Sequence, residues 1–110
     1  MFDRDYAILQ QFLNDTGYEL KTTFFQDFSI ADRFGDNAIR DTYKRAFAEW
    51  KDNIEYITEL CMMLNWKSWQ YAEVNIPRSQ LYVDLYEKLY DWCGKNLSKK
   101  DLQYFYKTLD

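Results

Sequence analysis

The chain has 110 residues and a net charge of −4, and it contains ten Tyr, eight Phe and four Trp but no His, three Gly and one Pro. A chain of this length is expected to form one domain, residues 1–110, with a core that needs no disulfide or metal. Without histidine, the Ser and Cys triads and the Glu-x-x-His metal site are excluded. The composition therefore predicts a helical, non-enzymatic domain with an aromatic core and without a cofactor.

Charge and hydropathy restrict the compartment and the partners. No apolar run approaches the roughly 18 residues of a membrane span, and the first residues lack the features of a signal peptide. We therefore expect a cytoplasmic protein that does not bind a membrane, with Cys61 and Cys93 reduced and buried. Residues 1–60 carry 12 acidic and 7 basic side chains, and residues 61–110 carry 6 and 7. Because affinity for phosphates needs a basic surface, direct binding of nucleic acid is not expected.

The first third of the chain predicts two helices and a connector. Asp3 can cap a helix through about Thr16, with Gly17 as its stop. Its predicted inward face consists of Tyr6, Leu9, Phe12 and Leu13. Residues 18–24 alternate apolar and polar positions, but no second strand exists to pair with them, so we expect an extended connector. Thr22 or Thr23 then begins a short helix that ends at Gly35 and turns Phe25, Phe28, Ala31 and Phe34 inward.

The remaining helices follow from caps and apolar periods. Asp36 and Asn37 open a third helix, whose apolar residues recur three and four apart as a core-facing helix requires. The pair Asp52 and Glu55 resembles a capping box, so a break near residue 53 is preferred to one continuous helix over 37–74. A fourth helix is expected at about 53–74, a fifth at 78–93 ended by Gly94, and a last one capped by Ser98 and Asp101. The predicted fold is all-α: a compact single-domain bundle of five or six helices around the central helix at 53–74.

The central helix carries apolar residues in almost every direction. Its predicted core positions include Ile57, Leu60 and Leu64, whereas Met62, Trp66 and Trp69 gather on a different side. Glu55, Glu59 and Glu73 border that side. Either the first two helices cover the tryptophans, or Met62, Trp66 and Trp69 form a surface for a partner or for self-association, because Trp and Met are enriched at interface hot spots.

Tyr82, Tyr86 and Tyr90 form a second candidate surface on the fifth helix. They are spaced one turn apart at the edge of its apolar arc, where a tyrosine ring can be buried while its hydroxyl stays hydrated. The alternative is that they only flank the core.

Carboxylate pairs leave two other functions open. Glu55 and Glu59 lie one turn apart, and Asp27 and Asp32 flank Phe28, as a metal-dependent hydrolase without histidine would require. The surplus of carboxylates in residues 1–60 is also compatible with an acidic inhibitor that mimics nucleic-acid phosphates. On a helical chain such residues more often form a solvated face.

Residues 24–35 (FFQDFSIADRFG), 41–51 (DTYKRAFAEWK) and 64–67 (LNWK) resemble a group of small uncharacterised helical proteins of gut bacteria and their phages or integrated mobile elements. The resemblance spans about residues 22–110 and implies a small accessory protein that acts in assembly, in scaffolding or by interfering with a host factor. It implies no catalytic residue. The expected function is a non-enzymatic acidic interaction protein that contacts a protein partner or its own copies through an aromatic surface.

Overall fold

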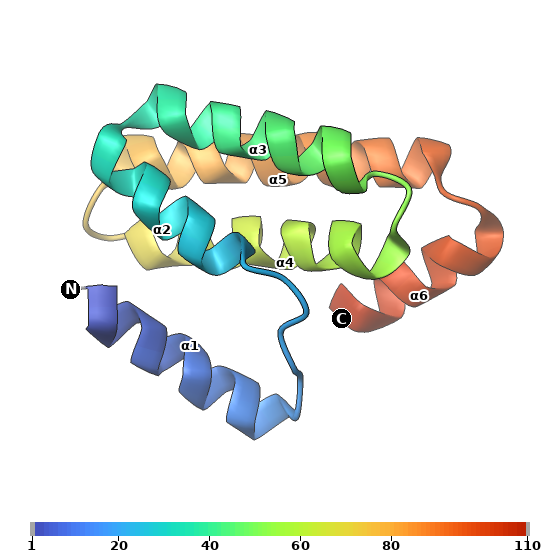
Figure 1. The fold of residues 1–110 in the computed structure, drawn as a ribbon, viewed down its shortest axis with the longest axis horizontal. Coiled ribbons are helices and arrows are strands. Elements are labelled where there is room, and N and C mark those ends of the chain that lie inside the picture. The colour runs from blue at the N-terminus through green and yellow to red at the C-terminus, as the bar shows by residue number, and fades with distance from the viewer. Residues whose placement is uncertain (1, 110) are drawn as a thin grey trace.

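The computed structural model describes residues 2–109, and the side chains of residues 7–109. The predicted all-α bundle is confirmed (Figure 1). Its helices are α1 (Phe2–Thr16), α2 (Phe24–Phe34), α3 (Asp36–Trp50), α4 (Ile54–Tyr71), α5 (Ile76–Asn96) and α6 (Lys99–Leu109). Asp3 and Tyr6, the expected cap and first core residue of α1, lie outside the described side chains.

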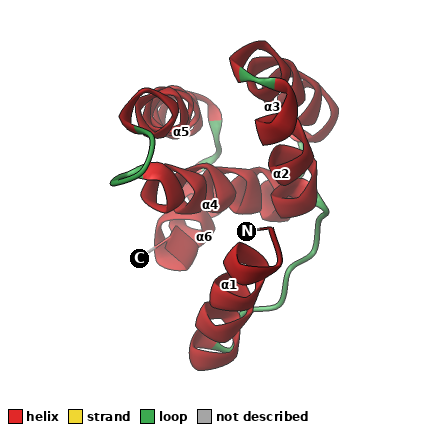
Figure 2. Cartoon of the chain, turned by 90° about the vertical axis from the view of Figure 1, so that its left-hand side faces the viewer, coloured by secondary structure: helices red, strands yellow, loops and turns green. Residues whose placement is uncertain are grey.

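The helix α4 is the centre of the bundle, as its apolar sequence predicts. Figure 2 shows α3 and α5 on one side of it and α1 and α6 on the other. Ile57, Leu60 and Leu64 are fully buried, and buried residues of all six helices join them in one core cluster. Leu85 of α5 and both cysteines are also buried, and the cysteines are free thiols. A helix that is apolar all round needs neighbours on every side, and this packing supplies them.

The predicted break between α3 and α4 is confirmed, but the capping residue is Asn53 and not the predicted Asp52. Asn53 has extended backbone angles, and its side chain accepts a hydrogen bond from the Tyr56 amide at 3.1 Å. This bond satisfies one of the free amides of the first turn of α4. The helix α4 ends at Tyr71, earlier than the predicted Val74.

The conformations of the glycines explain why two predicted helix ends are correct and a third is wrong. Gly17 and Gly35 have φ of 74° and 111°, a region that favours glycine, and they follow α1 and α2 as expected. Gly94 does not end α5, which continues to Asn96. Its backbone is helical, so it has no role as a left-handed stop. The same helix begins at Ile76 because the Asn75 side chain accepts from the Arg78 amide at 3.1 Å.

Candidate functional site

The three side chains proposed as a surface on α4 differ in exposure. Trp69 is 70% exposed. Met62 and Trp66 are half-buried and pack against the core cluster, and the Trp66 ring lies 5.4 Å from that of Phe12 on α1. The helix α1 therefore covers Trp66 and leaves Trp69 exposed to solvent. Trp66 is thus covered as one of the two interpretations expected, whereas Trp69 is exposed and its role in binding a partner stays a prediction.

Glu59 does not border this surface, contrary to the prediction. It is fully buried and accepts hydrogen bonds from the Tyr18 hydroxyl and the Lys21 and Thr22 amides, each at 2.8 Å, and from the Thr22 hydroxyl. A buried carboxylate is tolerated when donors satisfy both oxygens, and here the connector between α1 and α2 supplies them. Glu59 thus anchors that connector to α4. Burial, followed by the bond to Glu59, raises the pKa of the Tyr18 phenol above its usual range.

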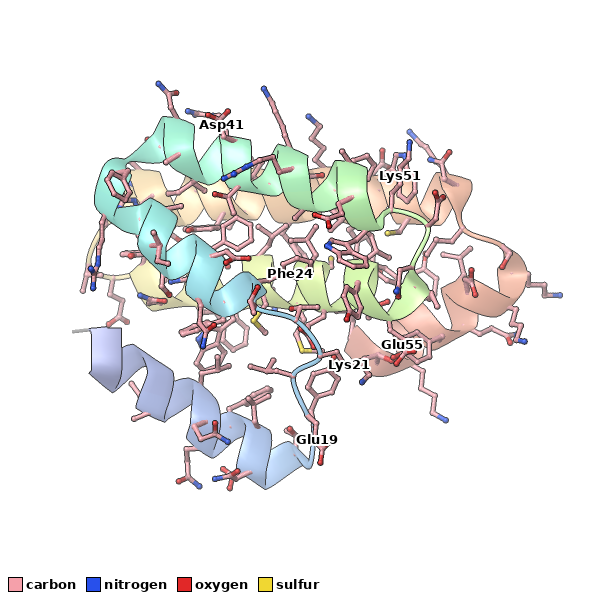
Figure 3. The ribbon with its side chains drawn as sticks, viewed as in Figure 1. Glu19, Lys21, Phe24, Asp41, Lys51 and Glu55 are labelled. Carbon is pink, nitrogen blue, oxygen red and sulfur yellow. The ribbon has the colours of Figure 1, made fainter. Side chains whose placement is uncertain are left out.

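The neighbouring Glu55 remains on the surface. Its carboxylate lies 3.7 Å from the Lys21 ammonium, and Figure 3 shows the two side chains near each other beside the connector. Glu55 and Glu59 therefore face different environments, one hydrated and one buried. They do not form the carboxylate pair that a hydrolase would need.

The tyrosine ladder of α5 is only partly on the surface. Tyr82 is fully buried and donates its hydroxyl to Asp32, so its assignment to a partner-binding surface is wrong. Tyr86 is half-buried, and Tyr90 is 39% exposed. The Tyr90 ring packs against Phe105 and Tyr106 of α6, at centroid distances of 5.6 and 5.8 Å. On a helical wheel Tyr82 lies at the edge of the apolar arc of α5. In the structure, the Phe28 ring of α2 and the Tyr71 ring of α4 pack against Tyr82 and cover that edge.

A different group contains the four most exposed large apolar residues among the described side chains. Phe34 and Val74 are each 78% exposed, Ile76 is 71% exposed and Trp69 is 70% exposed. We call these four residues the apolar end, because they lie at the α2–α3 junction, in the last turn of α4 and in the α4–α5 turn, at the left of Figure 1. Of the four, only Trp69 was a predicted site residue. Phe34 was expected to point inward and is a correction.

Polar contacts hold the two turns of the apolar end together. The Arg78 guanidinium donates to the Asp32 carbonyl at 2.8 Å and lies 3.6 Å from the Asp36 carboxylate. Asp32 in turn accepts from the Lys67 ammonium at 2.8 Å and from the Tyr71 hydroxyl at 2.7 Å. The helices that carry the exposed apolar residues are therefore joined by a network of charged and polar groups beneath them.

The cluster around Asp32 is the strongest candidate for chemistry, and its burial argues against a reaction. The Lys67 ammonium is 2.9 Å from the Ser29 hydroxyl. In some enzymes a serine nucleophile and a lysine base are neighbours in this way. Lys67 is 1% exposed and Ser29 is 6% exposed, so a substrate has no access to either. An ammonium that is paired with Asp32 has no lone pair with which to take a proton from Ser29. We interpret the cluster as structural.

The other half of the predicted carboxylate pair lies apart from this cluster. Asp27 is exposed and accepts from the Thr23 hydroxyl at 3.1 Å, whereas Asp32 faces α4 and α5. Within the described residues, no group of three or more His, Cys, Asp or Glu side chains is placed to hold a metal ion. None of the described helices combines the length and the apolar character that crossing a bilayer requires.

An open groove of about 1240 Å³ runs between α2, α3 and the connector. Phe24, Trp50 and Tyr56 line its apolar part, and Ile30 and Phe34 lie along α2. Three cations and three carboxylates surround it, namely Lys21, Lys44, Arg45, Asp27, Asp41 and Glu49. Figure 3 shows Phe24 and Asp41 on two sides of this region. The mixed charge selects no class of ligand.

Comparisons with protein-family models, with curated proteins and with solved structures find no match to this chain. The function is therefore inferred from the geometry of the chain itself.

Proposed function

We propose that this chain is a non-enzymatic interaction protein whose apolar end contacts a protein partner. The observation that carries the proposal is the segregation of exposed apolar residues. The four most exposed large apolar side chains all belong to one end of the bundle. At the opposite end, none of the described residues in the α3–α4 and α5–α6 turns is an exposed large apolar residue.

Apolar side chains that are exposed to water favour association, because an interface removes them from water. Burying one side chain of the size of Val, Ile or Phe contributes about 1.5–3 kcal/mol relative to leaving it exposed. Single exposed apolar residues are common on soluble proteins, and the proposal depends on four of them occurring at the same end of the bundle. Trp69 and Phe34 add aromatic rings, which are enriched in the centres of interfaces.

The alternative of a phosphate-mimicking inhibitor is weakened by where the carboxylates lie. Asp32 and Glu59 are buried and bound by donors within the chain. Glu55 and Asp36 are paired with Lys21 and Arg78. A mimic needs an array of exposed, unpaired carboxylates, and these four do not contribute to one. The resemblance to accessory proteins of phages and mobile elements favours a phage or host protein as the partner.

A capture experiment tests this proposal. The wild-type protein, the double variant Phe34→Ser with Trp69→Ser, and the control Tyr106→Ser are immobilised and exposed to lysate of the source organism. Tyr106 is a suitable control because it is 38% exposed and lies on α6. We expect a protein that the wild type and the control retain and the double variant loses, while circular dichroism shows all three folded. Equal retention by the double variant contradicts the proposal.

A further inference from the structure

A buried carboxylate ties the connector between α1 and α2 to the central helix. One oxygen of Glu59 accepts from the Tyr18 hydroxyl and the Lys21 amide, and the other accepts from the amide and the hydroxyl of Thr22. A fully buried carboxylate is stable only while such donors surround it. Because all four bonds end on one side chain, they form or break as a group.

The helix α1 packs as a cover on one face of α4. Among its described side chains Leu9 and Leu13 are buried, and the Phe12 ring packs against that of Trp66. The side-chain hydrogen bonds described for residues 7–16 stay within α1 and the two residues that follow it. Figures 1 and 2 show α1 outermost, at the bottom of both views, with the connector leading from it to α2. The described contacts of α1 with the bundle are therefore mainly apolar.

The other five helices have packing and polar contacts of their own. Apart from Leu9 and Leu13, the buried hydrophobic residues described all come from α2–α6. Asp32 of α2 binds Lys67 of α4 and Tyr82 of α5, so these three helices are joined independently of α1. Parts of a protein that are joined in this way can open separately, with free energies below that of global unfolding.

We propose that α1 and the connector form a detachable cover on α4, that Glu59 is its latch, and that the cover opens as one unit while α2–α6 stays folded. Opening exposes Trp66 together with the part of the core that Leu9 and Leu13 cover. The chain then has a closed form, in which Trp66 is covered, and a minor open form, in which it is not. This inference goes beyond the proposed function and does not depend on a partner at the apolar end.

Native-state hydrogen exchange tests the cover, measured by NMR on the full chain in urea below the unfolding transition. The amides of Lys21 and Thr22 report the latch, those of α1 report the cover, and those of α5 report the rest of the bundle. We expect the first two groups to share one opening that is at least about tenfold more populated than that of α5. Its urea dependence should be smaller than that of α5 but above zero, because the slope scales with the surface exposed.

Two variants and a matched control test the coupling. In Glu59→Gln the NH₂ group faces the amide of Lys21 or that of Thr22, whichever way it is turned, so the opening should become at least about tenfold more populated. Leu13→Ala removes buried surface from α1, and it should raise the opening of the Lys21 and Thr22 amides by the same factor as that of α1. Glu55→Gln makes the same chemical change one turn away, at a surface ion pair, and should change the opening less than about threefold.

Three results overturn the proposal. If the amides of α1 and α5 share one opening free energy and one urea slope, α1 opens only with the whole bundle. If the α1 amides exchange independently of each other and without a urea slope, the helix frays and does not open as a unit. If Glu59→Gln changes the exchange of α1 no more than Glu55→Gln does, Glu59 is not the latch. Should Glu59→Gln fail to fold, Leu13→Ala decides, because faster exchange of α1 without faster exchange of Lys21 and Thr22 contradicts a shared unit.

Discussion

Replacing Asp32 should destabilise the fold more than replacing its ionic partner Lys67. The two side chains are 8% and 1% exposed, and their charged atoms lie 2.8 Å apart. Asp32→Ala would remove the carboxylate partner of the buried Lys67 ammonium, and it would remove the acceptor of the Tyr71 and Tyr82 hydroxyls. Breaking a buried pair in this way costs about 3–5 kcal/mol.

The reverse change should cost less. In Lys67→Met, the Asp32 carboxylate still accepts from two tyrosine hydroxyls, and the methionine side chain fills most of the lysine volume. Loss of the charged hydrogen bond to Asp32 is worth about 1.5–3 kcal/mol, and the bond to the Ser29 hydroxyl is lost with it. Since domains of this size are stable by about 5–15 kcal/mol, both variants should remain measurable, with Asp32→Ala nearest to unfolding.

Urea denaturation followed by circular dichroism gives the comparison. The double variant Asp32→Leu with Lys67→Met removes both charges, so we expect it to be more stable than Asp32→Ala alone. The reasoning is refuted if Asp32→Ala lies within about 1 kcal/mol of the wild type, a cost typical of an exposed pair. It is also refuted if Lys67→Met is the more damaging of the two single variants.

Three further predictions concern the other buried groups. Glu59→Gln should lower the free energy of unfolding by about 1.5–3 kcal/mol, because the connector loses its charged acceptor. For the same reason trypsin should cleave faster after Lys21, and unchanged cleavage would show that Glu59 does not hold the connector. Burial raises the pKa of Cys93 from 9.0, and that of Tyr43 from 10.0, to about 12 in each case. The protonated forms therefore stabilise the fold fully below about pH 9, and urea midpoints should fall as the pH rises towards about 12; a constant midpoint across that range would contradict this. Thiol reagents should modify Cys61 and Cys93 only after unfolding, since both side chains are fully buried; rapid labelling of the native protein would reveal local opening.

Local signals in the sequence were sufficient to predict that the helices exist, although the predicted ends at Val74 and Gly94 are wrong. The break at Asn53 and the beginning of the last helix at Ser98 depend on side chains that bond to amides three residues ahead. Caps and apolar periods act within one or two turns, so they can be read without knowing the neighbours. The same periodicity correctly placed Leu64 and Leu85 in the core.

Local signals did not predict the hydrogen-bond partners of the buried polar residues. Glu59 and Lys67 occur on a helix where an apolar residue meets almost every direction, and a solvated position was the natural expectation for a charge. Their burial depends on Thr22 and Asp32, which lie 37 and 35 residues away in the chain. Tyr82 is buried for the same reason, because Asp32 lies 50 residues away from it.

By itself, the sequence determined that the chain is an all-α bundle around a central helix, predicted at 53–74, because caps and helical periods are local properties. Only the tertiary structure decided which aromatic residues remain exposed, since α1 covers Trp66 and leaves Trp69 uncovered. It also decided where the apolar end lies. Phe34 ends α2 and Val74 follows α4, and they lie at the same end of the bundle because α2 and α4 are joined there through the Asp32 network.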